Sequence, residues 1–158
     1  RDVALNHTAG LSLPQQAQLL LFSLFQLMDE DNSYQESVMK ILSHRVKMIL
    51  VGLGSDVHIG PFYADYYGLI DFEFWLKKYA DEEVIQFVKE HYHPLDIVFR
   101  LAEDHSIVLL NGGGFDAPDW SVRVSFANLP DEVYLDIGRA VKAVARGYVE
   151  AYRHFKGK

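Results

Sequence analysis

Residues 12–30 restrict the fold of this chain more than any other segment, because they predict a helix that is apolar all around its axis. Ser12 is a good N-cap residue, and Pro14 is tolerated in the first turn. Leucine, phenylalanine and methionine fill most positions from 19 to 28 and do not form a single stripe. We expect this helix to be buried on most sides, since it is too apolar to be stable alone in water.

The rest of the sequence predicts an α+β unit, a small sheet covered by helices. Ser33 and Glu36 have the spacing of a capping box, which predicts a second long helix that ends near Leu50, before Gly52. Further along the chain we expect, in order, a strand at 63–70, helices at 72–79, 81–91 and 94–104, a short buried strand at 107–110, a glycine turn at 111–114 and an amphipathic helix at 130–155.

A strand with one apolar face is predicted just before that last helix. Val122, Val124 and Phe126 alternate with Arg123 and Ser125, so Arg123 should point away from the apolar face. Two interpretations of Arg123 are open. Its guanidinium matches the geometry of a carboxylate and could bind one through two hydrogen bonds, or it is an ordinary solvated arginine on an open sheet face.

Composition argues against several classes of function. The formal net charge is -7, with 15 Lys and Arg against 22 Asp and Glu, which argues against a nucleic-acid surface. The chain has no cysteine, so it has no disulfide and no thiolate metal site. This suits a reducing compartment, and we expect a cytoplasmic protein. No apolar run reaches the roughly 18 residues of a membrane span, so we expect no membrane partner.

Two pairs of residues invite a functional interpretation but also have simpler ones. His7 and Thr8 lie in a loop before the first helix, where functional residues are common, although such a pair is also ordinary turn chemistry. His91 and His93 would need a third ligand to hold a metal. Exposed histidines at a helix end are the simpler interpretation, and we predict no metal site.

Two stretches of the sequence resemble a known enzyme family. Residues 108–115, VLLNGGGF, followed by residues 121–129, SVRVSFANL, are similar to the C-terminal signature of the fold-type I PLP-dependent aminotransferases. In that family a strand leads into a proline-glycine turn, and the next strand carries an arginine that binds the α-carboxylate of the substrate. Residues 3–29 resemble a branch of the family, the aspartate 4-decarboxylases, which convert L-aspartate to L-alanine and CO₂ and also have aspartate transaminase activity.

The resemblance implies a place in the enzyme and a set of roles. Residues 1–32 would be a remnant of the large, cofactor-binding domain, and residues 33–158 would be the small C-terminal domain. Arg123 would bind the α-carboxylate of a small amino-acid substrate. His7 and Thr8 match a segment that reaches the neighbouring subunit's active site in such dimers, or lies just behind it, so a homodimer or higher oligomer is expected. The cofactor would be pyridoxal 5′-phosphate (PLP).

The sequence departs from the family at two points. Asn111 stands where the family has the turn proline, although the glycines of the turn are kept. The lysine that holds the cofactor belongs to a segment upstream of Arg1, so we predict that this chain alone neither binds PLP covalently nor catalyses. Two alternatives are open: a plain aminotransferase of another amino acid, and a free-standing α+β interaction domain.

Overall fold

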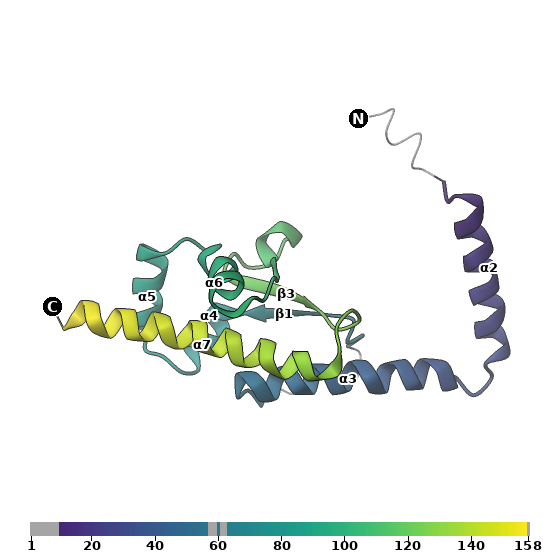
Figure 1. Cartoon of the computed structure of the whole chain (residues 1–158), viewed down its shortest axis with the longest axis horizontal. Helices are drawn as coiled ribbons and strands as arrows, with labels where there is room; N and C mark the ends of the chain where they lie inside the picture. The colour runs from purple at the N-terminus through teal and green to yellow at the C-terminus, as the bar shows by residue number, and fades with distance from the viewer. Residues whose placement is uncertain (1–9, 57–59, 61–62, 158) are drawn as a thin grey trace. The chain divides into compact units, whose positions relative to one another are not determined.

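The computed structural model describes residues 10–56, 60 and 63–157. The chain divides into two compact units, residues 1–38 and 39–158. In chain order the elements are α2 (Leu13–Met28), α3 (Ser33–Leu53), β1 (Tyr67–Asp71), α4 (Phe72–Lys77), α5 (Glu82–His91), α6 (Asp96–His105), β2 (Leu110–Asn111), the 3₁₀ turn η1 (Gly112–Phe115), β3 (Ser121–Ser125) and α7 (Asp131–Lys156) (Figure 1). This order confirms the predicted succession of elements, while the division into large-domain and small-domain parts after residue 32 stays a prediction.

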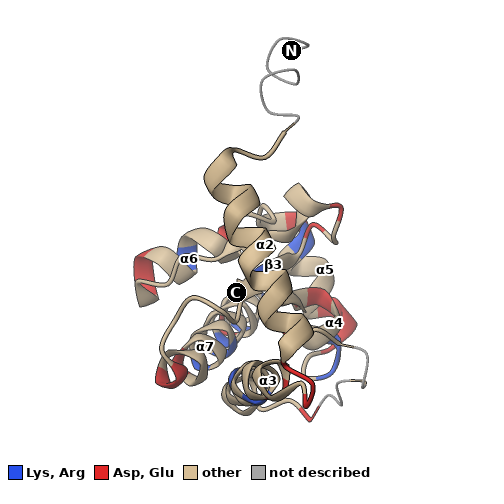
Figure 2. Ribbon diagram, turned by 90° about the vertical axis from the view of Figure 1, so that its right-hand side faces the viewer, with Lys and Arg blue, Asp and Glu red and all other residues tan. Residues whose placement is uncertain are grey.

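Helix α2 begins as predicted, but its side chains are not buried. Ser12 donates from its backbone N and from its Oγ to Gln15 Oε1, both at 2.9 Å. Figure 2 shows α2 without a single Lys, Arg, Asp or Glu, and none of its residues is buried. Within its own unit, Phe22 and Phe25 contact Tyr34 in the first turn of α3, with ring centroids 6.0 and 5.4 Å apart. One turn cannot cover a helix on all sides, so the predicted burial is not found among the described residues.

Helix α3 begins where predicted, but with a different cap. The carboxylate of Asp29 takes the role predicted for Ser33: its Oδ1 accepts from Ser33 N at 3.1 Å, and its Oδ2 accepts from Tyr34 N at 2.9 Å. The bond from Tyr34 N, followed by the one from the Ser33 hydroxyl, lowers the pKa of Asp29. The prediction of Ser33 as the cap is therefore wrong, because Ser33 is the first residue of the helix and the carboxylate of Asp29, one turn earlier, accepts from the first two free N–H groups.

The second unit is built on a three-stranded antiparallel sheet in the order β1-β3-β2. Arg123 in the central strand has Leu69 of β1 and Leu110 of β2 as its cross-strand partners. The predicted α+β class is confirmed. The predicted buried strand at 107–110 is wrong, because Val108 is 80% exposed and pairing starts only at Leu110, on an edge strand.

Helix α7 covers one face of this sheet and supplies much of the core. Val122 and Val124 of β3 are 0% and 1% exposed, and the ring of Phe126 lies 5.7 Å from that of Tyr134 on α7. The inner face of α7 is buried over four turns, at Tyr134, Ile137, Gly138, Ala140, Val141, Val144, Ala145 and Tyr148. Helices α5 and α6 contact α7 as well. The predicted amphipathic stripe is thus confirmed, and the opposite sheet face, which bears Arg123, is less covered.

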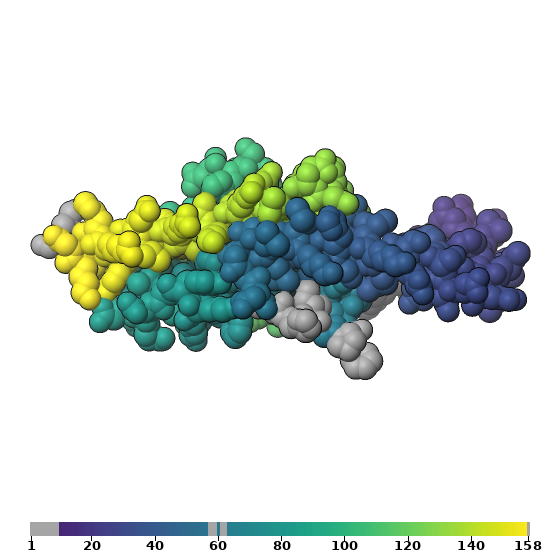
Figure 3. All heavy atoms as spheres, turned by 90° about the horizontal axis from the view of Figure 1, so that it is seen from below, coloured from purple at the N-terminus to yellow at the C-terminus, as the bar shows by residue number. Residues whose placement is uncertain are grey.

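Helices α3 and α7 approach closely in the second unit, as the blue and yellow-green spheres of Figure 3 show side by side. A Cβ on Gly138 would lie 2.9 Å from Gly52 Cα and from Leu53 N. A Cβ on Gly52 would likewise lie 2.9 Å from Gly138 Cα and from Arg139 N. Gly52 was predicted to follow the helix end, but it is buried inside α3, because its lack of a side chain lets the two backbones touch.

None of the helices in the described part of the chain is both long and apolar enough to cross a membrane.

Candidate functional site

The site is centred on Arg123, in the middle of the central strand. Its neighbours Val122 and Val124 point into the core, so the strand's alternation places Arg123 on the opposite face, where it is half-buried. The strand with one apolar face was correctly predicted. The structure adds the surroundings of the guanidinium, which the sequence pattern could not supply.

Two aromatic rings contact the Arg123 guanidinium. Its Cζ lies 3.9 Å from the ring centroid of Tyr67 and 4.2 Å from that of Phe115. Such cation–π contacts are electrostatically favourable and leave the N–H groups at the edge of the guanidinium unused. The side chain of Arg123 has no hydrogen bond or ion pair with any residue that the structure describes. A cation without an acidic partner among these residues is suited to bind an external anion.

The surface around Arg123 is apolar and open to solvent. Tyr67 is 47% exposed, Leu69 45%, Leu110 55% and Phe115 51%. A shallow cavity of about 230 Å³ adjoins Arg123, lined by Tyr67, Val108, Leu109, Leu110, Arg123, Val124, Ser125, Asn128 and Leu129. An apolar surround strengthens the interaction of a cation with an anion, because it lowers the local dielectric constant when the site is covered.

The glycine turn positions Phe115 beside Arg123. The Asn111 side chain caps η1 by accepting a hydrogen bond from Gly113 N at 3.3 Å. A Cβ on Gly112 would collide with the Ser121 hydroxyl, which itself donates to Pro118 O at 2.5 Å, so only glycine fits there. The turn presents the next strand, as predicted, although Asn111 replaces the proline of the family pattern.

The pairing of β1 with β3 places Tyr67 beside Arg123. Its partner in the ladder is Ser125, two residues from Arg123, which makes Tyr67 the diagonal neighbour of Arg123 on one face. The Tyr63 hydroxyl donates to Tyr67 O at 2.6 Å, and the Tyr66 ring packs edge-on against the Tyr67 ring at 4.7 Å. Burial, and then the charge of Asp65, raises the pKa of Tyr63, so this hydroxyl keeps its proton.

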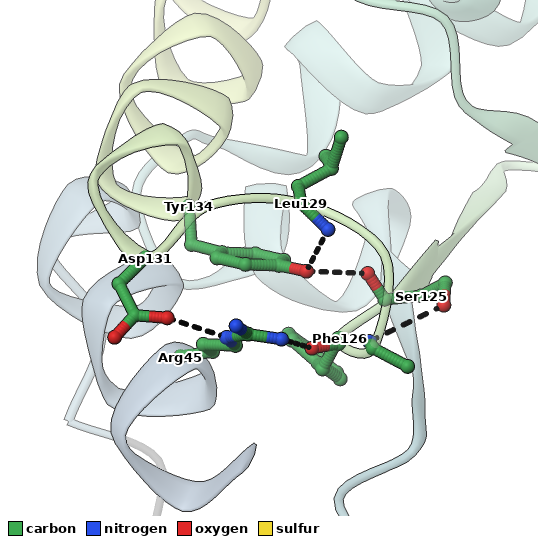
Figure 4. A network of polar contacts seen from close by, with 7 residues as sticks. Arg45, Ser125, Phe126, Leu129, Asp131 and Tyr134 are labelled. Carbon is green, nitrogen blue, oxygen red and sulfur yellow. Dashed lines mark hydrogen bonds and ion pairs between the residues drawn. The ribbon is translucent and has the colours of Figure 1, made fainter. Parts of the chain in front are cut away.

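A polar network fixes the chain where it leaves β3 (Figure 4). Arg45 of α3 donates from Nη1 to Phe126 O at 2.7 Å and from Nε to Asp131 Oδ1 at 2.6 Å. The Tyr134 hydroxyl donates to Ser125 O at 3.1 Å and accepts from Leu129 N at 3.2 Å. Helices α3 and α7 thus both bind the segment that begins at Ser125, two residues after Arg123.

The other residues singled out in the sequence do not join this site. His7 and Thr8 lie outside the described residues. His91 Nδ1 lies 2.9 Å from Phe87 O, and His93 Nδ1 accepts from Leu95 N at 3.2 Å, so both rings have local backbone partners. No group of three metal-ligating side chains occurs in the described ranges of the chain.

Tyr67 and Phe115 are the site residues that sequence reasoning missed. Phe115 was part of the recognised turn motif, and Tyr67 was part of an aromatic strand, but neither was assigned to Arg123. The signal that would have found Tyr67 is the register of β1 on β3, because the aromatic must stand two residues from the position opposite Arg123. Register is not visible in the sequence of one strand.

Comparison with known proteins shows that the chain is similar to an enzyme of known activity. No family model matches the chain. The chain is 40% identical over 153 residues to the bifunctional aspartate aminotransferase and L-aspartate beta-decarboxylase of a Pseudomonas species. The match covers 97% of this chain but only 29% of the relative's length. The resemblance drawn from the two sequence motifs is thereby confirmed.

Proposed function

We infer that the chain belongs to the family of this relative, the PLP-dependent aminotransferases of fold type I that include the aspartate decarboxylases. We propose that it is the C-terminal part of an enzyme that converts L-aspartate to L-alanine and CO₂ and also has aspartate transaminase activity. The 40% identity over nearly the whole chain supports this proposal. The chain spans 29% of the relative's length, so we assign the proposed activity to the whole enzyme and not to this chain alone.

The state of Arg123 is the single observation that carries the proposal. Its guanidinium has no acidic partner among the described residues, lies on the open sheet face, and is surrounded by half-exposed apolar side chains. A substrate α-carboxylate supplies the charge that is missing there and matches the guanidinium with two parallel hydrogen bonds. Arg123 would thus orient the amino acid by the end that does not react in decarboxylation.

The cofactor would be held by the remainder of the enzyme. When bound, PLP supplies the electron sink that accepts the charge left on the substrate as CO₂ departs. The described residues fit a position beside such a cofactor, since Arg123 offers a cation to an anionic substrate on a face that this chain leaves open. We propose that the lysine for PLP lies outside this chain, which by itself would be inactive.

The same proposal extends to the assembly. Helix α2 exposes Leu20, Leu21, Leu27 and Met28 by 61% to 81%, and apolar surface of this kind tends to be covered by association. We propose a homodimer or higher oligomer in the cytoplasm. In it, His7 and Thr8 would lie at or just behind the neighbouring subunit's active site.

Substitution of Arg123 in the full-length, PLP-loaded enzyme tests the function. Arg123→Gln should lower kcat/KM for L-aspartate, which corresponds to a loss of about 2–5 kcal/mol in transition-state binding. This is the usual cost of removing one partner of a desolvated charge pair. Arg139→Gln is the matched control, because Arg139 is an exposed arginine of α7 paired only with Asp136 among the described residues.

Product analysis separates the alternatives. Alanine and CO₂ from L-aspartate support the decarboxylase, whereas keto-acid exchange alone would identify a plain aminotransferase. An unchanged rate for Arg123→Gln would remove Arg123 from the site. A reading frame that encodes no further domain would favour the free-standing interaction domain.

A further inference from the structure

The two rings beside Arg123 have a role of their own in this site. We propose that Tyr67 and Phe115 are positioning residues, which hold the Arg123 guanidinium by its faces and leave only its edge open to a carboxylate. The proposal rests on the proposed role of Arg123 as the carboxylate-binding residue, and it names the residues that make this arginine selective for a planar anion.

The distances place the rings on different sides of the guanidinium. Cζ of Arg123 lies 3.9 Å from one ring centroid and 4.2 Å from the other. Tyr67 and Phe115 have no ring contact with each other, although each is this close to the same carbon atom. All N–H donors of a guanidinium lie in its plane. With one ring over each face, as we propose, an anion reaches these donors from the edge, where a carboxylate fits best.

Both rings come from rigid parts of the fold. Tyr67 begins β1, and its carbonyl is held by the Tyr63 hydroxyl at 2.6 Å. Phe115 ends η1, whose start is fixed by the Asn111 cap and by the lack of space at Gly112. The rings therefore restrict Arg123 before the ligand arrives, and the loss of side-chain entropy on binding becomes smaller.

The exposure of the rings supports this role. Each is about half-exposed, 47% for Tyr67 and 51% for Phe115, so neither is needed to fill the core. The loss of one exposed cation–π contact corresponds to about a two- to five-fold loss of affinity. Because the rings act on the position of Arg123 and not on the reacting bonds, this loss should fall on substrate binding more than on turnover.

The experiment uses the full-length, PLP-loaded enzyme with Tyr67→Leu and Phe115→Leu. KM for L-aspartate and the Kd for succinate, a non-reacting dicarboxylate measured by calorimetry, should each rise about two- to five-fold, with a smaller change of kcat. Tyr67→Phe and Phe115→Tyr keep the rings and should give the parent values. Phe99→Leu is the matched control, since Phe99 is 60% exposed on α6 and makes no ring contact with Arg123.

A double-substitution cycle shows whether the rings act through Arg123. In an Arg123→Gln background, loss of either ring should cause no further rise in the succinate Kd, because the guanidinium is gone. The proposal is overturned if both leucine variants have the KM and the succinate Kd of the parent enzyme. It is also overturned if loss of a ring raises the succinate Kd by the same factor in the Arg123→Gln background. Tyr67→Met and Phe115→Met provide a second ring-free pair if a leucine variant does not fold. Failure of the proposed function is distinct, because Arg123→Gln alone would then leave KM and Kd unchanged.

Discussion

Replacement of Gly138 by alanine tests whether the close approach of α3 and α7 stabilises the second unit. The new Cβ would lie 2.9 Å from Gly52 Cα and from Leu53 N, whereas ordinary Cβ contacts begin at 3.4 Å. These atoms belong to the backbone and cannot rotate away, and Ile49 O would lie closer still, so the helices must separate by about 0.5–1 Å. A gap of this size weakens the dispersion contacts of the apolar side chains on both sides by a quarter to a half.

The expected free-energy change has two opposing parts. Overpacking of this kind costs about 1–3 kcal/mol. Alanine also favours the helix over glycine by about 1 kcal/mol, which offsets part of that cost. We expect Gly138→Ala to lower the free energy of unfolding by about 0–2 kcal/mol, whereas the control below should raise it.

Gly147 provides the control within the same helix. A Cβ there meets only the flexible end of Arg100, at 3.7 Å. Gly147→Ala should therefore stabilise the unit by about 0.5–1 kcal/mol through helix propensity and the restricted unfolded chain. Urea unfolding followed by tryptophan fluorescence reports on this unit, because Trp75 and Trp120 both lie in it. If Gly138→Ala were as stable as Gly147→Ala, the tight crossing would not be a constraint on the fold.

Two further substitutions test buried polar contacts by the same unfolding assay. The buried Tyr148 hydroxyl donates to Asp96 Oδ2 at 2.6 Å, so Tyr148→Phe should cost about 1–3 kcal/mol of stability. Burial, followed by this bond, raises the pKa of Tyr148. Above about pH 10 the Tyr148 hydroxyl therefore loses its proton in the unfolded chain before it does so in the folded one, and the free energy of unfolding falls as the pH rises. Tyr148→Phe should show a smaller fall over the same pH range. Arg45→Met should cost about 1–3 kcal/mol, because it leaves Phe126 O without its donor, while the exposed Arg139→Met should change stability by less than about 0.5 kcal/mol. Equal effects for the two arginines would show that the network of Figure 4 does not stabilise the end of β3.

The elements that could be predicted from the sequence are those with a strong local pattern. The apolar stripe of α7 repeats with the period of a helix, and the alternation at 122–126 repeats with the period of a strand. The structure confirms both predictions. The end of α3 was misplaced because Gly52 has two possible meanings. A glycine can end a helix or allow another helix to approach, and only the position of Gly138, 86 residues later, decides between them.

The candidate site divides in the same way. Arg123 was found because its strand pattern and motif are local. Tyr67 and Phe115 were not assigned to it, because they depend on the register of β1 and on the exit direction of η1. Both are tertiary facts that no window of sequence contains. The apolar run at 107–110 was mistaken for a buried strand for a related reason: a short apolar run is compatible with a core strand and with an exposed edge strand.

The two faces of the sheet differ in how they are covered. One face is fixed by the α7 stripe, and the Arg45 and Tyr134 contacts extend that rigidity to the residues just after Arg123. The other face carries exposed apolar side chains that would be a liability on a self-contained domain. The arginine on this face has no acidic partner among the described residues, which supports our proposal that the face is a binding surface completed by another part of the enzyme. The stability of the covered face and the binding proposed for the open face should therefore respond to different substitutions: Gly138 and Arg45 should affect the first, and Tyr67, Phe115 and Arg123 the second.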